Sequence, residues 1–437
     1  MKKIFASIIF LACAVSIATA QETVYPTKEN KDHFVITNAT IHIGNGQVIE
    51  NGFVEVNNGK IVKVSAGAVT QGARVVDASG KHVYPGLILP VTDLGLKEIG
   101  NGVRGSNDFL ELGDLNPSVR SIVAYNTDSK FINVLKANGI LLAGVTPEGG
   151  TITGSSSVVQ LDAWNWEDAA YKMDNAIHLN MPNLVIRPAV RRRINLTTPQ
   201  LSPADQLKEA LQKVEEVKGF FKEAKVYNQE AAHKETNLKL EAVKGLFNGT
   251  QKLFVHANQV KQMLVAIDFA KDFGFNVVIV GGNESYLIAD LLKQNNIAVI
   301  LNDEHRLPDT EDEDVDQPFK TPAALQKASV LFALNDENGE TRYRNLPFNA
   351  GTAAAYGLTK EQALQAITLN SAKILGIDKT TGSLEEGKDA NIVISNGDIL
   401  DMKSSIITDA FIQGRAVSLD NKQKQLYERY KYKYAIK

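Results

Sequence analysis

The chain has 437 residues, of which 44% are hydrophobic and 22% are charged, and its formal net charge is −3. This length is too great for one ordinary domain and suits a large domain accompanied by a smaller one. The slightly acidic balance argues against a nucleic-acid partner, because proteins that bind nucleic acids need basic surface to displace counterions from phosphates.

The first twenty residues, MKKIFASIIFLACAVSIATA, have the three parts of an export signal. Two lysines precede an apolar core over residues 4–17, and small residues at 18–20 form a cleavage site. We therefore expect residues 1–20 to be a signal peptide and the mature protein to be periplasmic or secreted. A lipoprotein modified at Cys13 is the weaker alternative, because the residues before it match a lipobox poorly. Cleavage after residue 20 removes the only cysteine and excludes disulfides and thiolate chemistry. No later stretch is apolar enough to span a membrane.

Both ends of the mature chain have a β-rich pattern. Residues 33–82 alternate apolar and polar side chains and contain Asn-Gly hairpin signals, which predict four short antiparallel strands and a fifth strand over 73–76. A similar pattern returns over residues 383–420, so we predict that both segments form one small β-sandwich domain. Residues 421–437 are basic and aromatic, and we interpret them as a solvated packing tail rather than an interaction motif.

Residues 83–382 have an α/β pattern. Strands such as KLFVHA are apolar throughout and are followed by amphipathic helices, which indicates a sheet buried on both faces and mostly parallel. A repeat of this length favours a (β/α)8 TIM-like barrel, inserted in the small β domain. Residues 202–250 are charged and helical, with Ser202 as the predicted N-cap, and we interpret them as an enlarged barrel helix or an inserted lid.

Four segments, in this order and spacing, resemble the amidohydrolase superfamily, in particular its imidazolonepropionase-like branch. They are VVDASGKHVYPGLI, PEGGTITGSSSVVQLDAW, RNLPFNAGTAAAYGLTKEQALQAITLNSAKILGID and TGSLEEGKDANIVI. The resemblance extends from about Phe34 to Val417. It implies a hydrolase that uses one or two divalent metals at the C-terminal mouth of the barrel. Such an enzyme would cleave carbon–nitrogen bonds in cyclic amides, amides or peptide-like substrates.

The ligand set that this resemblance implies is incomplete. In the family the first barrel strand ends in Asp-x-His-x-His or close to it, whereas here Val91 replaces the first histidine and Asp93 the second. His256 matches the fifth-strand histidine, glycine stands at the sixth-strand position, and Asp336 is the candidate for the final aspartate. Because valine and glycine cannot bind a metal, we predict a degraded site without the binuclear centre. His256, Asp93 and Asp336 leave a mononuclear set for zinc, manganese or iron, with Asp336 as the catalytic residue.

Other polar residues follow predicted strand ends and are candidates for a substrate pocket. Asn283 and Glu284 follow the sixth strand, His305 follows the next one, and Arg187 begins the basic stretch RPAVRRR. Strand ends meet at the barrel mouth, where such residues would face a substrate. The basic stretch could equally neutralise neighbouring acidic helices. We assign His178 to a helix or loop, and no residue is assigned to the family's fourth-strand position.

Two functions remain compatible with these residues. The first is a hydrolase of carbon–nitrogen bonds with a reduced metal site and weak or no activity. The second is a pseudoenzyme that binds a small-molecule or peptide-like ligand, as a homo-oligomer or as the partner of an active paralogue. The chemistry favours the second, because metal ligands that are lost are rarely replaced. The Gly-x-Ser-x-Gly motif of α/β-hydrolase-type serine hydrolases does not occur.

Overall fold

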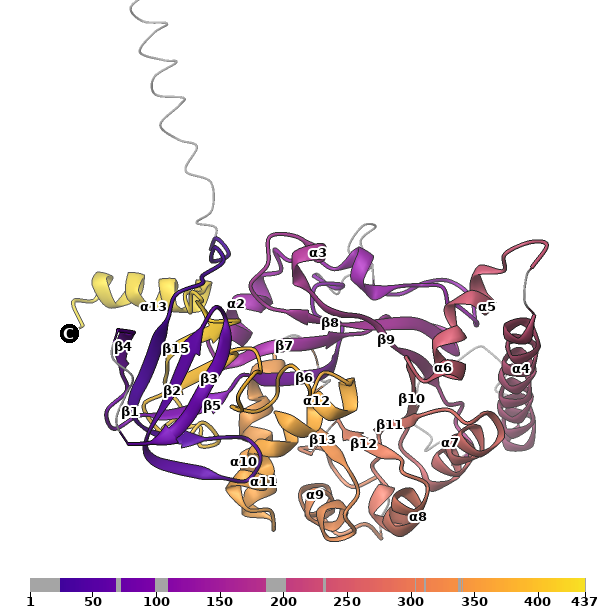
Figure 1. Cartoon of the computed structure of the whole chain (residues 1–437). Helices are drawn as coiled ribbons and strands as arrows, with labels where there is room; N and C mark the ends of the chain where they lie inside the picture. Colours follow the sequence, from indigo (N-terminus) through magenta and orange to yellow (C-terminus); the bar gives the residue numbers. More distant parts are fainter. Residues whose placement is uncertain are drawn as a thin grey trace, which may run out of the picture.

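The computed structural model describes residues 24–67, 72–98, 109–185, 202–230, 233–302, 304–309, 312–336, 339 and 341–436. The predicted signal peptide, residues 1–20, lies outside the described residues. The described chain forms two eight-stranded sheets, one curved into a barrel and one belonging to a separate β domain (Figure 1). This arrangement confirms the predicted barrel with a β domain made from both chain ends.

The β domain consists of strands from the beginning and the end of the chain. They are β1 (Phe34–His42), β2 (Val48–Asn57), β3 (Lys60–Ala66), β4 (Arg74–Asp77), β5 (His82–Pro85), β14 (Ile392–Ser395), β15 (Ile407–Ile412) and β16 (Arg415–Ala416). Antiparallel pairing of β14 with β5 joins the two chain ends, while β4 pairs with β1 in parallel. Only three strands precede β4, because the predicted Asn51-Gly52 turn lies inside β2, where Asn51 has a φ of 47°. Asparagine tolerates this left-handed conformation and so the strand continues.

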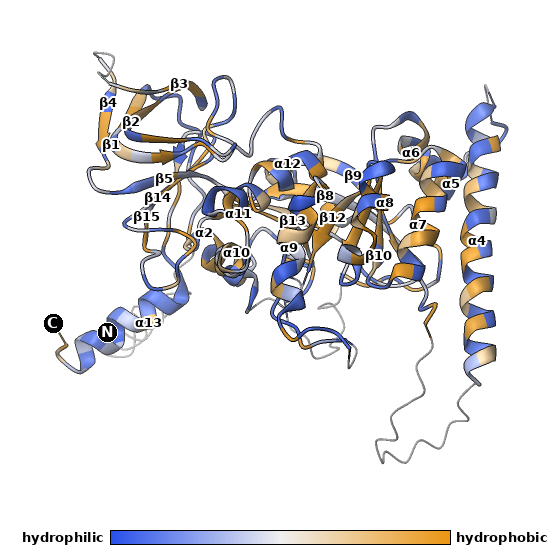
Figure 2. Ribbon diagram, turned by 90° about the horizontal axis from the view of Figure 1, so that it is seen from below, coloured by the Kyte–Doolittle hydropathy of each residue, from blue (hydrophilic) through white to orange (hydrophobic). Residues whose placement is uncertain are grey.

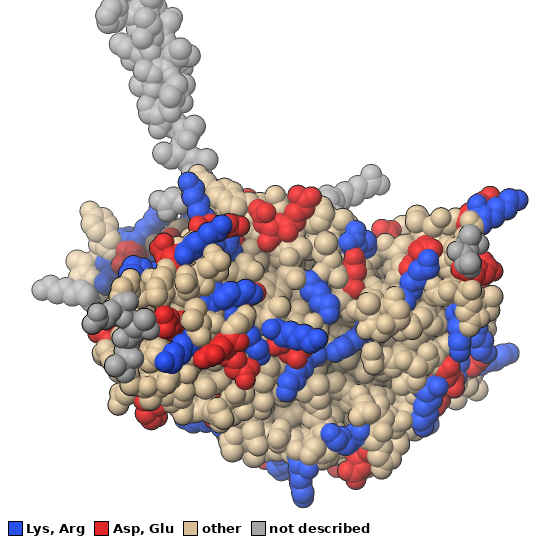
Figure 3. Space-filling model, in the orientation of Figure 1, with Lys and Arg blue, Asp and Glu red and all other residues tan. Residues whose placement is uncertain are grey.

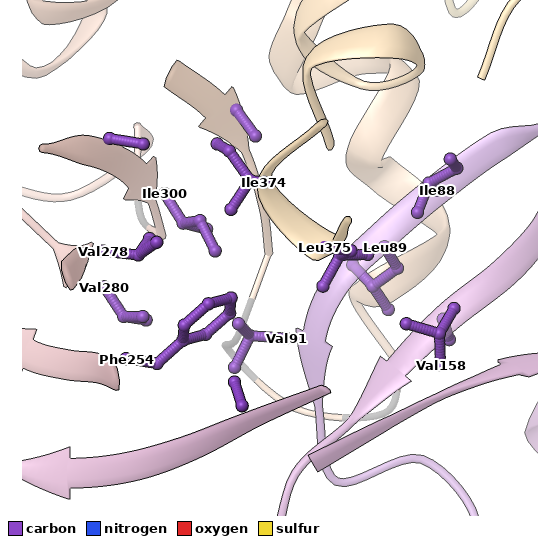
Figure 4. Packing of buried hydrophobic residues seen from close by; sticks show 14 of the residues in the cluster. Ile88, Leu89, Val91, Val158, Phe254, Val278, Val280, Ile300, Ile374 and Leu375 are labelled. Carbon is purple, nitrogen blue, oxygen red and sulfur yellow. The ribbon is translucent and has the colours of Figure 1, made fainter. Parts of the chain in front are cut away.

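The barrel sheet contains eight strands with apolar interiors. They are β6 (Leu87–Thr92), β7 (Ile140–Val145), β8 (Ile152–Gln160), β9 (Ala170–Asn180), β10 (Lys252–Ala257), β11 (Val277–Gly281), β12 (Ala298–Leu301) and β13 (Phe332–Leu334). Side chains from different strands meet in one cluster, where Figure 4 shows Val91 directed toward the ring of Phe254. Val91, at the position of a family metal ligand, is therefore part of the apolar packing of the barrel.

One strand departs from the predicted parallel arrangement. β8 is antiparallel to both of its neighbours, β7 and β9. The loop between β7 and β8 contains only residues 146–151, and Gly149 and Gly150 have φ values of 91° and 71°. These glycines turn the chain directly back, and a loop of six residues is too short for the crossover that a parallel strand needs.

Helices cover the outside of the barrel. They are α2 (Lys130–Lys136), α3 (Trp166–Ala169), α4 (Pro203–Gln229), α5 (Leu238–Ala242), α6 (Lys244–Asn248), α7 (Val260–Phe273), α8 (Ala289–Gln294), α9 (Gln317–Lys327), α10 (Leu346–Ala355), α11 (Lys360–Ala366) and α12 (Leu369–Leu375). The long α4 begins at the predicted cap, where Ser202 Oγ accepts from the Asp205 amide. Its buried Phe221 packs against Phe269 and Phe273 of α7, so α4 lies outside the helices that cover this side of the barrel (Figure 2).

The barrel is closed between its last and first strands by a side chain. Asn335 follows β13 and is completely buried. Its amide nitrogen donates to the Val91 carbonyl at 2.9 Å, and its oxygen accepts from the Val91 amide at 3.2 Å. An asparagine side chain thus makes the two hydrogen bonds that a neighbouring strand would otherwise supply.

Charged side chains of both signs are interspersed over the face in Figure 3, and they do not form a broad basic field of the kind that binds nucleic acids. The last helix, α13 (Lys422–Lys433), extends away from the two sheets (Figure 1). Among the described residues, no helix combines the length and the apolar character needed to cross a membrane.

Candidate functional site

A cavity of about 200 Å³ lies at the C-terminal mouth of the barrel. Its lining combines polar residues from several elements: Asp93, Glu148, Thr153, Asn180, His256 and Tyr343. The ends of β6, β9 and β10 and the β7–β8 hairpin supply five of these residues, and Tyr343 comes from a short 3-10 helix (Tyr343–Asn345) that precedes α10. In a barrel of this type the strand ends are the usual location of a ligand site.

Asp93 lies just beyond β6, and protein groups already bind its carboxylate. The hydroxyl of the buried Tyr343 donates to Asp93 Oδ1, and Lys97 Nζ lies 3.7 Å from Oδ2. Asp93 is only 7% exposed, so these contacts compensate for the loss of water around its carboxylate. The Tyr343 hydroxyl and the Lys97 ammonium thus occupy its two oxygens, and the positive charge of Lys97 disfavours binding of a divalent metal there.

His256 is hydrogen-bonded to a second histidine that the sequence did not place at the site. His178 lies in β9, not in a helix or loop as predicted, and its Nδ1 is 2.9 Å from His256 Nε2. His178 is completely buried, and within the described part of the chain its Nε2 has no hydrogen-bond partner. Burial lowers the pKa of His256 to about 4, while burial and the neighbouring His256 lower the pKa of His178 well below its usual value. Both imidazoles are therefore neutral at pH 7.

Asp336 lies apart from the cavity lining. It follows Asn335 after β13 and is 1% exposed. Asn349 Nδ2 donates to Asp336 Oδ2 at 3.2 Å, and Arg342 Nε lies 4.0 Å from Oδ1. The structure brings Asp93 and His256 to one cavity but places Asp336 among amide and guanidinium donors.

Of the four residues predicted for a substrate pocket, Asn283, Glu284 and His305 do not line this cavity. Glu284 Oε2 accepts from the Val260 amide at 2.8 Å and so caps the start of α7. Asn283 donates to Asp309 Oδ2 at 2.9 Å, and the exposed His305 is 2.9 Å from Thr352 Oγ1. These contacts hold loops and helices together. Arg187 lies outside the described residues.

The donor set does not fit the metal that the resemblance implies. Within the described ranges, no group of three or more His, Cys, Asp or Glu residues is arranged to hold a metal ion. The two carboxylates are held by Tyr343, Lys97 and Asn349, and the remaining histidine is bonded to His178. A metal held against water needs about three protein ligands with free lone pairs, and these residues do not offer them together.

Thr153 is a polar residue of the cavity that the sequence did not single out. It lies in β8, is 2% exposed, and its Oγ1 has no hydrogen-bond partner among the described residues. A buried hydroxyl without a partner is costly, unless a ligand or water supplies one. No motif around Thr153 marks its hydroxyl as functional, because the segment GGTITGSSS is notable only for its small residues.

Replacing His256 by glutamine should flatten the acid side of the pH–stability profile. The unfolded histidine has a pKa of about 6.5 and the folded one about 4, so the unfolded chain binds more protons between these values. The contribution of His256 to the free energy of unfolding is thus fully present above about pH 6.5. It decreases as the pH falls toward the folded pKa, by up to about 3 kcal/mol. Urea unfolding at pH 7.5, 6, 5 and 4.5 measures the slope.

The exposed His305 provides the control for this experiment. His305→Gln should keep the pH slope of the wild type, because this side chain is exposed in the folded chain and its surroundings change little on unfolding. An identical slope in wild type and His256→Gln would show that His256 is not held neutral by burial.

Comparisons with known proteins support the family. The amidohydrolase family profile matches residues 335–417. An imidazolonepropionase of Flavobacterium psychrophilum is 33% identical over 107 residues, which are 22% of this chain and 26% of that protein. The structure of an amidohydrolase from Thermotoga maritima has a TM-score of 0.75 and 26% identity, and the match covers 88% of this chain and 99% of that one. An adenosine deaminase from Xanthomonas campestris with bound zinc shares the fold, with a TM-score of 0.53, 15% identity and coverage of 93% and 98%.

The sequence and structure comparisons differ in extent. The chain spans about a quarter or less of the length of the curated relatives that it matches by sequence, whereas the structural match to the Thermotoga protein covers nearly the whole of both chains. The family profile matches the segment that follows β13, which contains α10 to α12 and the last three strands of the β domain. Together with the barrel and its appended β domain, these matches show that the chain is similar to the amidohydrolase family, with imidazolonepropionases among its relatives in sequence.

Proposed function

We propose that this amidohydrolase-family protein binds a small amide-containing ligand at the barrel mouth and does not hydrolyse it by the metal-activated water of its family. The observation that carries this proposal is the engagement of Asp93 and His256 by protein groups, Tyr343 and His178, within the cavity where a metal would be expected. A hydrolase with one remaining metal is the alternative, and the metal content of the purified protein separates the two.

The cavity lining supports a small, neutral or cationic ligand. Its volume of about 200 Å³ is below the roughly 300 Å³ at which drug-sized sites begin. Asp93 and Glu148 contribute negative charge, while His256 is neutral at pH 7 because burial lowers its pKa. The Thr153 hydroxyl and the Asn180 amide can exchange hydrogen bonds with both sides of an amide group. A cyclic amide or an amino-acid-sized amide matches this combination.

Two measurements on residues 21–437 test the proposal. Zinc, manganese and iron in the purified protein should be well below one ion per chain, and His256→Ala should leave the metal content unchanged. Thermal shifts are then measured with hydantoin, 2-pyrrolidinone and a neutral dipeptide. At least one of these compounds should raise the Tm of the wild type by mass action.

Thr153→Val is the sharpest variant, because valine keeps the shape and removes the hydroxyl. Since this hydroxyl has no hydrogen-bond partner among the described residues, its loss should leave the Tm of the free protein unchanged or higher. The Tm shift caused by the ligand should fall, because a ligand hydrogen bond of about 1 kcal/mol is lost.

Thr408→Val in β15 of the β domain is the matched control, and it should keep the full ligand shift. Near-stoichiometric metal that disappears in His256→Ala would overturn the proposal and establish the mononuclear hydrolase. The absence of any ligand shift across these compounds would reject the proposed ligand class.

A further inference from the structure

The C-terminal helix α13 has little tertiary packing, because Gln425, Leu426 and Lys431 are only partly buried and its other residues are exposed. It extends away from both sheets, and none of its residues is buried (Figures 1 and 2). Its first turn is capped by Asn421, whose side chain accepts from the Lys424 amide at 3.0 Å. A helix of 12 residues that buries nothing is only marginally stable in water, so contact with another surface would stabilise it.

Positive charge is concentrated in this segment. Residues 422–437 contain six of the 47 lysines and arginines but one of the 50 acidic residues. The segment therefore has a net charge of +5, while the rest of the chain has a net charge of −8. The contrast shows that the basic character belongs to α13 and not to the protein as a whole.

A stripe of tyrosines runs along α13 between lysines. Tyr427, Tyr430 and Tyr434 are spaced by three and four residues and so share one face of the helix. All three are exposed, and the rings of Tyr430 and Tyr434 stack with centroids 6.4 Å apart. Lys433 Nζ lies 5.9 Å and 5.0 Å from these two ring centroids, and Lys431 follows Tyr427 by one turn.

We propose that α13 is a docking helix for an anionic lipid surface. Tyrosine is enriched where proteins meet the membrane–water interface, and lysines beside it reach lipid phosphates while their stems cover apolar surface. An acidic protein would match the charge alone, whereas the tyrosine stripe fits a lipid interface in addition.

The start of the described chain lies beside this helix. Val24 lines the same cavity, about 440 Å³ in volume, as Asn421, Lys422 and Gln425 at the base of α13. The start of the described chain and the base of α13 thus lie on the same side of the molecule. The proposal is independent of the ligand proposed for the barrel mouth.

Co-sedimentation of residues 21–437 with lipid vesicles tests the proposal. Vesicles of phosphatidylcholine with about 30% phosphatidylglycerol should bind the protein at low salt and release it as salt rises, because screening weakens the attraction. Pure phosphatidylcholine vesicles should bind it at least about tenfold more weakly. Binding to anionic vesicles should fall by about tenfold or more in a triple variant that combines Lys424→Glu, Lys431→Glu and Lys433→Glu.

Replacing Tyr427, Tyr430 and Tyr434 by serine should also weaken binding, while the melting temperature stays unchanged because α13 buries no residue. The matched control reverses three exposed lysines of α4, Lys208, Lys213 and Lys225, and should bind as the wild type does. Equal binding to neutral and anionic vesicles, or unchanged binding after the reversal in α13, would overturn the proposal. Binding to polyglutamate without binding to vesicles would assign α13 to an acidic protein and would also overturn it.

Discussion

Replacing Lys136 by methionine is expected to lower the free energy of unfolding by about 3–5 kcal/mol, because it leaves a buried carboxylate without its cation. Lys136 Nζ in α2 lies 2.9 Å from Asp162 Oδ1, and the two side chains are 3% and 0% exposed. Methionine fills the space of the lysine stem, so the loss of unfolding free energy comes from the unpaired charge of Asp162 and not from a cavity. Urea unfolding at pH 7.5 measures it.

The Asp162 carboxylate connects more than one part of the molecule. Its Oδ2 accepts from the Thr27 amide at 2.9 Å, which fastens the first described segment to the end of β8. Arg415 of β16 lies close by, with Nη2 3.4 Å from the Asp162 carbonyl. Loss of Lys136 should therefore also loosen the contact between the barrel and the β domain.

A second variant distinguishes the charge from local damage. Lys136→Met combined with Asp162→Asn removes the unpaired charge and keeps an oxygen for the Thr27 amide, so it should recover more than half of the lost stability. Lys130→Met, at an exposed position of the same helix, should cost no more than about 1 kcal/mol. If the Lys136 variant lost no more than the Lys130 variant, the buried pair would not stabilise the fold.

Replacing Asn335 by leucine should cost about 2–6 kcal/mol of unfolding free energy. The Val91 amide and carbonyl would both lose their side-chain partner inside the barrel, and each buried group left without a hydrogen bond costs about 1–3 kcal/mol. Because Val91 lies two residues before Asp93, the change should also disturb the cavity. Urea unfolding measures the loss of stability, and thermal shift with the ligand identified at the barrel mouth measures the change in the cavity.

Asn295→Leu is the control for the barrel closure. The Asn295 amide nitrogen donates to the Leu291 carbonyl of its own helix at 2.8 Å, at a partly exposed position. This change should cost less than about 1 kcal/mol. Equal effects of the two variants would mean that the Asn335 side chain does not close the barrel.

The sequence predicted the barrel and the β domain because their signals are local. Apolar strands followed by amphipathic helices repeat along the middle of the chain, and hairpin patterns appear at both ends. The antiparallel course of β8 was not predicted, because strand direction depends on the length and geometry of the loop over residues 146–151. Likewise, His178 was not placed in a strand, although Ile177 and Leu179 on either side of it are apolar, because so short an apolar run does not distinguish a strand from a helix.

The sequence by itself determined that Val91, Gly281 and Gly282, which the resemblance aligns with metal ligands, offer no side chain that can bind a metal. Only the tertiary structure decided what the remaining polar residues do. Tyr343 is 250 positions from Asp93 in the sequence, and His178 is 78 positions from His256. Hydrogen bonds over such separations depend on how the barrel closes, and they determine whether a carboxylate or an imidazole is available to a metal.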